Sequence, residues 1–194
     1  MGWAGDIANE CPAVAFATPT VRTVTQVVYA NENWATTIQG TGVEYPSIRE
    51  WSLRSGHWFT QQDVDAAAKV AVLGATVAEM LFGSVDPVGQ VMQIKNMPFR
   101  VVGLLTAKGR STVGQDQDDI ILMPYTTAQK ELIGVTYIRA ILASAVSSGL
   151  MGQALDQITA LLPSVIACLP GKKMIFRYDR SPTWRLPKRK ARAS

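Results

Sequence analysis

Cysteine and histidine are nearly missing from this chain of 194 residues, and their scarcity limits the sites that it can build. The two cysteines, Cys11 and Cys168, lie far apart and lack the close spacing of a metal site, so we predict that they are unrelated to each other. His57 is the only histidine, which excludes a histidine-rich metal site and makes any catalytic triad depend on this one residue. Because His57 lies in the segment SGHWFT, between a glycine and two aromatic residues, we predict that it packs or faces solvent.

Long hydrophobic runs and nucleotide-binding motifs are also missing. No segment reaches the roughly 18 uninterrupted apolar residues of a membrane span. The beginning, MGWAGDIANECPAV, contains acidic residues instead of the basic region and apolar run of a secretory signal, so we expect neither a span nor a signal in the chain as given. A glycine-rich phosphate loop, a dinucleotide fingerprint, paired cysteine clusters and a nucleophile elbow are absent. We therefore predict no catalytic, cofactor-binding or metal site.

The charge is unevenly distributed along the chain. The formal net charge is +4, but residues 163–194 hold nine Lys or Arg residues against one acidic residue, a net charge of +8. Residues 1–162 hold the remaining ten basic and fourteen acidic residues, a net charge of −4. An argument for a nucleic-acid partner would therefore rest on the last part of the chain alone.

The apolar pattern predicts short strands joined by tight turns. Predicted hairpins combine strands at about 20–30 and 34–40 around a turn at 31–33, and strands at about 91–95 and 99–107 around Asn96. Further strands are predicted in KVAVLG, DIILMP and IGVTYIRAILASA.

Helices are predicted between these strands. Three have an N-terminal threonine followed three residues later by an acid or glutamine: Thr60 with Asp63, Thr76 with Glu79, and Thr126 with Gln129. The others are predicted at 6–12, at 44–54 and at 149–162, where Pro163 ends the last one. Short helices alternating with strands and hairpins favour an α+β fold with mixed sheets over a doubly wound parallel sheet.

An acidic loop precedes the strand DIILMP. We give this name to Gln115, Asp116, Gln117, Asp118 and Asp119. A calcium loop of the EF-hand type counted from Asp116 fails at the fifth, sixth and twelfth positions. Acid–base chemistry would need a pocket and a group that binds substrate, and the neighbouring sequence offers neither. Local chemistry therefore favours a solvated loop whose aspartates fix turns.

An ordered series of motifs gives the chain a family resemblance. The motifs are VAVLG, LFG..DPVGQ, PFRVVG and GQDQDD....P.TTAQ, within a match over about residues 6–162. Together they resemble the periplasmic core domain of MacB-type ABC transporter permeases, the family of the macrolide exporter.

The resemblance implies a function and a set of partners. In this family an extracytoplasmic domain follows the first transmembrane helix and precedes three further transmembrane helices. The permease works as a dimer with cytoplasmic ATP-binding subunits or domains. The domain does no chemistry and needs no cofactor; it contacts a periplasmic adaptor and transmits conformational change for substrate efflux. The resemblance therefore implies a fragment of such a permease on the periplasmic face of the bacterial inner membrane.

The resemblance also implies two subdomains. Residues 1–42 and 134–162 would form a discontinuous porter-like α/β subdomain whose C-terminal part is incomplete. Residues 43–133 would form the inserted, sabre-like subdomain, and the acidic loop would lie in it as a surface for contact with the adaptor or the partner protomer.

The basic tail, residues 163–194, departs from the family pattern. Reverse translation with GC-rich codons and a shift of one base gives a segment that resembles the family's continuation, so we interpret the tail as frameshifted and disordered. On this interpretation its charge has no selected nucleic-acid partner. Genomic DNA without such a continuation in the alternative frame would contradict this interpretation.

Two other classes of function stay open from the sequence. One is a free-standing soluble binding module for a lipid, a peptide or a partner protein. The other is an enzyme with an unrecognised site formed by His57 and the acidic loop, although no motif connects the two regions.

Overall fold

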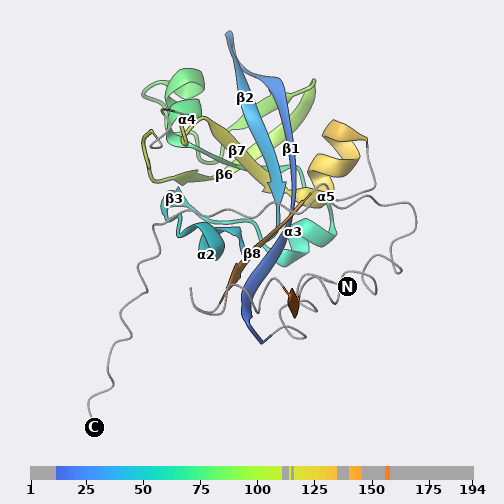
Figure 1. Cartoon of the computed structure of the whole chain (residues 1–194). Helices are drawn as coiled ribbons and strands as arrows, with labels where there is room; N and C mark the ends of the chain where they lie inside the picture. Colours follow the sequence, from blue (N-terminus) through green and yellow to red (C-terminus); the bar gives the residue numbers. More distant parts are fainter. Residues whose placement is uncertain (1–11, 111–113, 115, 135–139, 146–155, 158–194) are drawn as a thin grey trace.

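A computed structural model of the chain describes residues 12–110, 114, 116–134, 140–145 and 156–157 (Figure 1). Its strands are β1 (Val14–Tyr29), β2 (Glu32–Thr41), β3 (Leu53–Gly56), β4 (Val70–Leu73), β5 (Val91–Ile94), β6 (Met97–Leu105), β7 (Ile120–Pro124) and β8 (Ala140–Ala145). Its helices are α2 (Tyr45–Arg49), α3 (Gln61–Asp65), α4 (Ala75–Phe82), α5 (Tyr125–Thr127) and the π-helical turn η1 (Ala128–Ile133). The predicted α+β fold with short helices is confirmed.

Both predicted hairpins are present. β5 and β6 pair through Lys95 and Asn96, whose φ angles of 50° and 63° are those of a tight hairpin turn. β1 and β2 pair up to Tyr29 and Glu32, so their turn contains Ala30 and lies slightly before the predicted one. This hairpin projects beyond the rest of the described structure (Figure 1).

The strands form one mixed sheet whose pairings close into a ring. Its order is β2-β7-β4-β6-β5-β1, and β1 pairs with β2 again. The β2–β7 and β4–β6 pairs are parallel, and the other pairs of the ring are antiparallel. β4 and β7 are buried along nearly their whole length, which explains why their sequences are continuous apolar runs.

The two faces of these inner strands pack into separate clusters. On one face Leu73 and Ile121 pack with Leu81 and Phe82 of α4. On the other face lie Val72 and Leu122, together with Trp51 and aromatic residues near α2 and α3. Because successive side chains of a strand point to opposite faces, β4 and β7 connect the two clusters.

The strand β1 is shared by two ladders. Its first half, Val14 to Thr20, pairs with β8, and its second half, Val21 to Tyr29, pairs with β2. β8 falls in the predicted porter-like part, whereas β5 and β7, which pair with β1 and β2, fall in the predicted insertion. The division at residues 42 and 134 stays a prediction.

Local helix signals were partly right. The capping box of Thr60 and Asp63 is confirmed at the N-terminus of α3. The prediction for Thr76 was wrong, because α4 begins after Gly74 and the Thr76 hydroxyl bonds elsewhere. The prediction for Thr126 was also wrong: its helix begins at Tyr125, and the Thr126 hydroxyl donates to the Val64 carbonyl.

The region after β2 also differs from the prediction. The helix predicted at 44–54 is only α2, and Glu50 ends it in a left-handed conformation with φ of 47°. Trp51 then turns into the core, and its indole N–H donates to the Thr106 carbonyl at 2.7 Å. β3 follows as a strand that the sequence pattern did not indicate.

Several predictions lie outside the described residues. They concern the helix at 6–12, both cysteines, Gln115, most of the helix at 149–162 and the basic tail.

Candidate functional site

The aspartates of the acidic loop bond to three separate parts of the fold. Asp116 contacts α4, Asp118 contacts the chain after β6, and Asp119 contacts β2. The predicted use of aspartates to fix turns is thus seen in the contacts of this loop.

Asp118 is the most buried of the three, with 4% of its surface exposed. Its carboxylate accepts hydrogen bonds from the backbone N–H of Lys108, at 2.8 and 3.1 Å to its two oxygens, and from the N–H of Gly109 at 2.7 Å. These charge-assisted bonds compensate for the cost of burying the carboxylate. Asp118 therefore holds the turn after β6, and its carboxylate faces protein backbone.

Asp116 connects the loop to the first turn of α4. One of its oxygens accepts from the Thr76 hydroxyl at 2.7 Å, and the other accepts from the Asp118 N–H at 2.9 Å. Asp116 also forms an isolated backbone bridge with Arg110. The side chain of Asp116 is exposed, although both of its oxygens have partners.

Asp119 connects the loop to β2. Its Oδ1 accepts from the Trp34 indole N–H at 3.0 Å.

Gly74, just before α4, packs closely against the backbone at the end of the loop. It donates its N–H to the Ile120 carbonyl at 2.8 Å. A Cβ atom on Gly74 would lie 2.1 Å from the Asp118 carbonyl oxygen, so this position has no room for a side chain.

The geometry gives the loop a supporting role in the fold. Within the described ranges, no group of three or more His, Cys, Asp and Glu residues is placed to hold a metal ion. His57 is exposed after β3, and its backbone N–H donates to the Val102 carbonyl. The loop as a contact for the adaptor or a second protomer stays a prediction, in which Asp116 is an exposed member and Asp118 is not.

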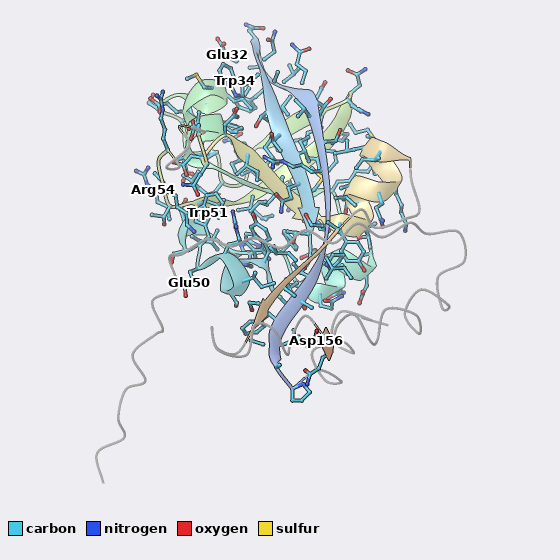
Figure 2. The ribbon with its side chains drawn as sticks, viewed as in Figure 1. Glu32, Trp34, Glu50, Trp51, Arg54 and Asp156 are labelled. Atoms are coloured by element: carbon cyan, nitrogen blue, oxygen red, sulfur yellow. The ribbon has the colours of Figure 1, made fainter. Side chains whose placement is uncertain are left out.

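Basic and aromatic residues lie beside the loop. The Lys108 ammonium donates to the Arg49 carbonyl at 2.6 Å and lies 4.9 Å from the centre of the Trp51 ring. Partial burial, together with the nearby Arg49 charge, lowers the pKa of Lys108 from its ordinary value. Figure 2 shows Trp51 and Arg54 on the same side of the molecule.

A second candidate feature is the place where β1 passes from its pairing with β8 to its pairing with β2, which we call the crossing. The Thr18 hydroxyl accepts from the Gly42 N–H at 2.9 Å and lies 3.5 Å from the Thr41 hydroxyl, in a buried position. A Cβ atom on Gly40 would approach Ala128 Cβ to 2.6 Å and Val21 Cγ2 to 2.7 Å. Close packing therefore holds the two strands together where β1 passes from one ladder to the other.

Most of these contacts have no signal in the sequence. The partners Thr76 and Trp34 lie 40 and 85 residues from the aspartates that they bind. The family resemblance implied a contact surface in the acidic loop, which stays a prediction, and the geometry reveals mainly bonds within the domain.

Comparison with known families gives one match over most of the chain. A family profile of MacB-like periplasmic core domains matches residues 3–161. The macrolide export ATP-binding/permease protein MacB of Chlorobium phaeobacteroides is 38% identical over 157 residues, which are 81% of this chain and 24% of that protein. The protein of the same name from Syntrophobacter fumaroxidans is 45% identical over 129 residues, which are 66% of this chain and 18% of that protein. The chain thus spans about a quarter or less of the length of these relatives.

Solved structures share the fold. The periplasmic region of MacB from Actinobacillus actinomycetemcomitans has a TM-score of 0.70 and 23% identity, over 84% of this chain and 72% of that chain. The extracellular domain of the noncanonic ABC-type transporter YknZ from Gram-positive bacteria has a TM-score of 0.68 and 15% identity, over 84% of this chain and 82% of that chain. In the described part of this chain, no helix has the length and apolar character needed to cross a membrane.

Proposed function

Because the chain belongs to the family of MacB-like periplasmic core domains, we propose that it is the extracytoplasmic coupling domain of an ABC transporter permease. In this role it contacts a periplasmic adaptor and transmits conformational change that begins at ATP-binding subunits or domains on the other side of the membrane. The intact permease is a homodimer at the bacterial inner membrane. The domain has no catalytic activity of its own.

The shared strand β1 is the observation that carries this proposal. Val14 to Thr20 pair with β8, and the following residues of the same strand pair with β2. A continuous strand hydrogen-bonded at both ends moves as a stiff element, because bending it would break ladder bonds. Displacement of β8 would therefore be passed to the β1–β2 hairpin without a flexible linker.

The tight crossing supports the same role. Gly40 and Gly42 let the strands approach Ala128 and Thr18 closely, so the two ladders meet in a packed core. The acidic loop adds bonds from β2 and α4 to the chain before β7. These contacts make relative sliding of the strands costly.

A chimeric transporter would test the proposal. Residues 3–161 would replace the matching segment of the C. phaeobacteroides relative, produced with that organism's adaptor in an efflux-deficient host. We expect the chimera to restore macrolide resistance and to bind the adaptor. A folded, membrane-inserted chimera that neither binds the adaptor nor exports would contradict the proposal and favour a free-standing binding module.

A matched pair of variants would test the role of β1. Gly40→Val places a side chain against Ala128 and Val21, whereas Val24→Ala changes an exposed position of the same ladder. We expect Gly40→Val to reduce export by roughly tenfold or more while ATP hydrolysis continues, and Val24→Ala to leave export unchanged. Equal export by both variants would contradict coupling through the crossing.

A further inference from the structure

The strand β3 has one ladder edge without a partner among the described residues. It pairs with β6 through Leu53, Ser55 and Gly56, and the structure describes no other strand beside it. The hydrogen bonds from Thr106 N–H to the Ser52 carbonyl and from His57 N–H to the Val102 carbonyl continue the pairing on the β6 side. An unpaired strand edge presents N–H and C=O groups that can pair with another extended chain.

A groove runs beside this edge. We call it the β3 groove; it has a volume of about 740 Å³ and lies between β3, α4 and the turn at 83–87. Ala75, Ala78 and Leu104 contribute apolar side chains to its lining, and the exposed Val85 lies on the turn. Figure 1 shows α4 and β3 on the same side of the molecule.

The charges around the groove distinguish between classes of occupant. Glu79 of α4 and Asp86 of the turn contribute two carboxylates, against the single guanidinium of Arg54 on β3. One Asp86 oxygen accepts the Val88 N–H at 3.0 Å, which fixes that carboxylate in place. The wall opposite the strand edge is therefore acidic, and it favours basic side chains.

We infer that the β3 groove binds a short extended segment of a partner protein by β-strand addition. The segment pairs its backbone with β3, directs apolar side chains towards Leu104 and Ala78, and places lysine or arginine side chains near Glu79 and Asp86. Main-chain bonds supply affinity in this mode, and alternate side chains supply specificity. Because β3 has four residues, the paired part of the segment is about equally short.

The inference goes beyond the proposed coupling function and does not depend on it. Its test uses the full 194-residue chain in solution, without a transporter, so its failure is distinguishable from failure of the chimera. The probes are three blocked hexapeptides. In the first, valine alternates with lysine; the second has glutamate in place of lysine; the third is the lysine peptide with N-methyl groups on alternate backbone nitrogens.

We expect the lysine peptide to bind with a Kd below about 1 mM and to slow amide exchange in β3. The glutamate and N-methylated peptides should bind roughly tenfold more weakly, because one lacks the charge match and the other lacks backbone donors. The double variant Glu79→Lys with Asp86→Lys should reverse the preference between the lysine and glutamate peptides. Glu32→Lys, at the hairpin end shown in Figure 2, is the matched control and should not change it.

Three outcomes would overturn the inference. One is the absence of lysine-peptide binding up to millimolar concentration. The second is equal binding of the N-methylated peptide, which would indicate a site for cationic side chains instead of a strand. The third is self-association of the chain in sedimentation experiments that the double variant abolishes, which would make a second copy the occupant. Circular dichroism of each variant checks that it folds.

Discussion

The acidic loop and the β3 groove both involve α4, and they use polar side chains in opposite ways. The loop has a dense and distinctive motif, yet its aspartates bond to Thr76, Trp34 and the backbone after β6. The groove takes its turn at 83–87 from the motif LFG..DPVGQ, and its two carboxylates, Glu79 and Asp86, line the wall opposite a strand edge. A cluster of charges in the sequence therefore indicates a binding site only when the fold leaves those charges available.

The largest expected effect is the loss of the buried carboxylate. Asp118→Ala leaves the Lys108 and Gly109 N–H groups without their acceptor, so we expect the free energy of unfolding to fall by about 3 kcal/mol. Urea denaturation measures this change. Asp65→Ala, an exposed acid on α3, should cost less than about 0.5 kcal/mol. Similar losses in the two variants would remove the distinction between a structural and a solvated aspartate.

The close packing of Gly74 should give the next largest effect. Gly74→Ala directs a methyl group at the Asp118 carbonyl oxygen, at a position whose backbone conformation alanine can otherwise adopt. We expect a loss of about 2 kcal/mol in thermal or urea unfolding, from the required backbone shift. Unchanged stability would show that the loop moves easily and is not held against α4.

The bond between the loop and α4 should contribute less. Thr76→Val keeps the shape of the side chain and removes the donor to Asp116, so we expect a loss of about 1 kcal/mol. A double-mutant cycle with Asp116→Ala measures the coupling between the two residues. If the losses are additive, the bond between Thr76 and Asp116 contributes nothing to stability. Such a result would mean that solvent replaces the bond, since Asp116 is exposed.

Charge reversal in the groove should hardly change stability. Glu79→Lys with Asp86→Lys alters two exposed residues, and we expect the free energy of unfolding to change by less than about 1 kcal/mol in total. The same double variant should reverse peptide preference, as described above. A large loss of stability would instead show that Glu79 and Asp86 support the fold, as Asp118 does.

The smallest expected effect concerns the pKa of Lys108. Because this pKa is lowered in the folded state, the charged Lys108 reduces stability at neutral pH, and the reduction disappears as pH rises from the folded pKa to the ordinary value of 10.5. Arg49→Met should raise the Lys108 pKa, since it removes a nearby positive charge. NMR titration of the Lys108 side chain measures the shift; Arg110→Met is a control with a basic residue two positions along the chain. If the pKa of Lys108 does not change in the Arg49 variant, the Arg49 charge does not contribute and burial alone lowers this pKa.

The parts of the fold that were predictable from sequence are local. The turn at Lys95 and Asn96 and the capping box of Thr60 and Asp63 depend on a few neighbouring residues. The prediction for Thr76 was wrong because a distant residue, Asp116, takes its hydroxyl. β3 was missed because its four residues are too few to show alternation and its pairing with β6 is non-local.

The site was less predictable than the fold. The sequence correctly indicated that aspartates fix turns, but it did not indicate that Asp118 is buried or that Asp119 reaches Trp34. Those contacts arise when β7 pairs with β2 and with β4, which local patterns do not encode. The groove depends in the same way on the position of α4 relative to β3.

The shared strand β1 also determines the order in which the domain can be assembled during synthesis. Val21 to Tyr29 can pair with β2 as soon as the hairpin leaves the ribosome, because the partners are adjacent in the chain. Thr20, one residue earlier, pairs with Ala140 and must wait until the chain has grown 120 residues beyond it. The first half of β1 is thus a nascent strand with an open edge until β8 has been made, the period in which a chaperone or a neighbouring chain would find it most readily.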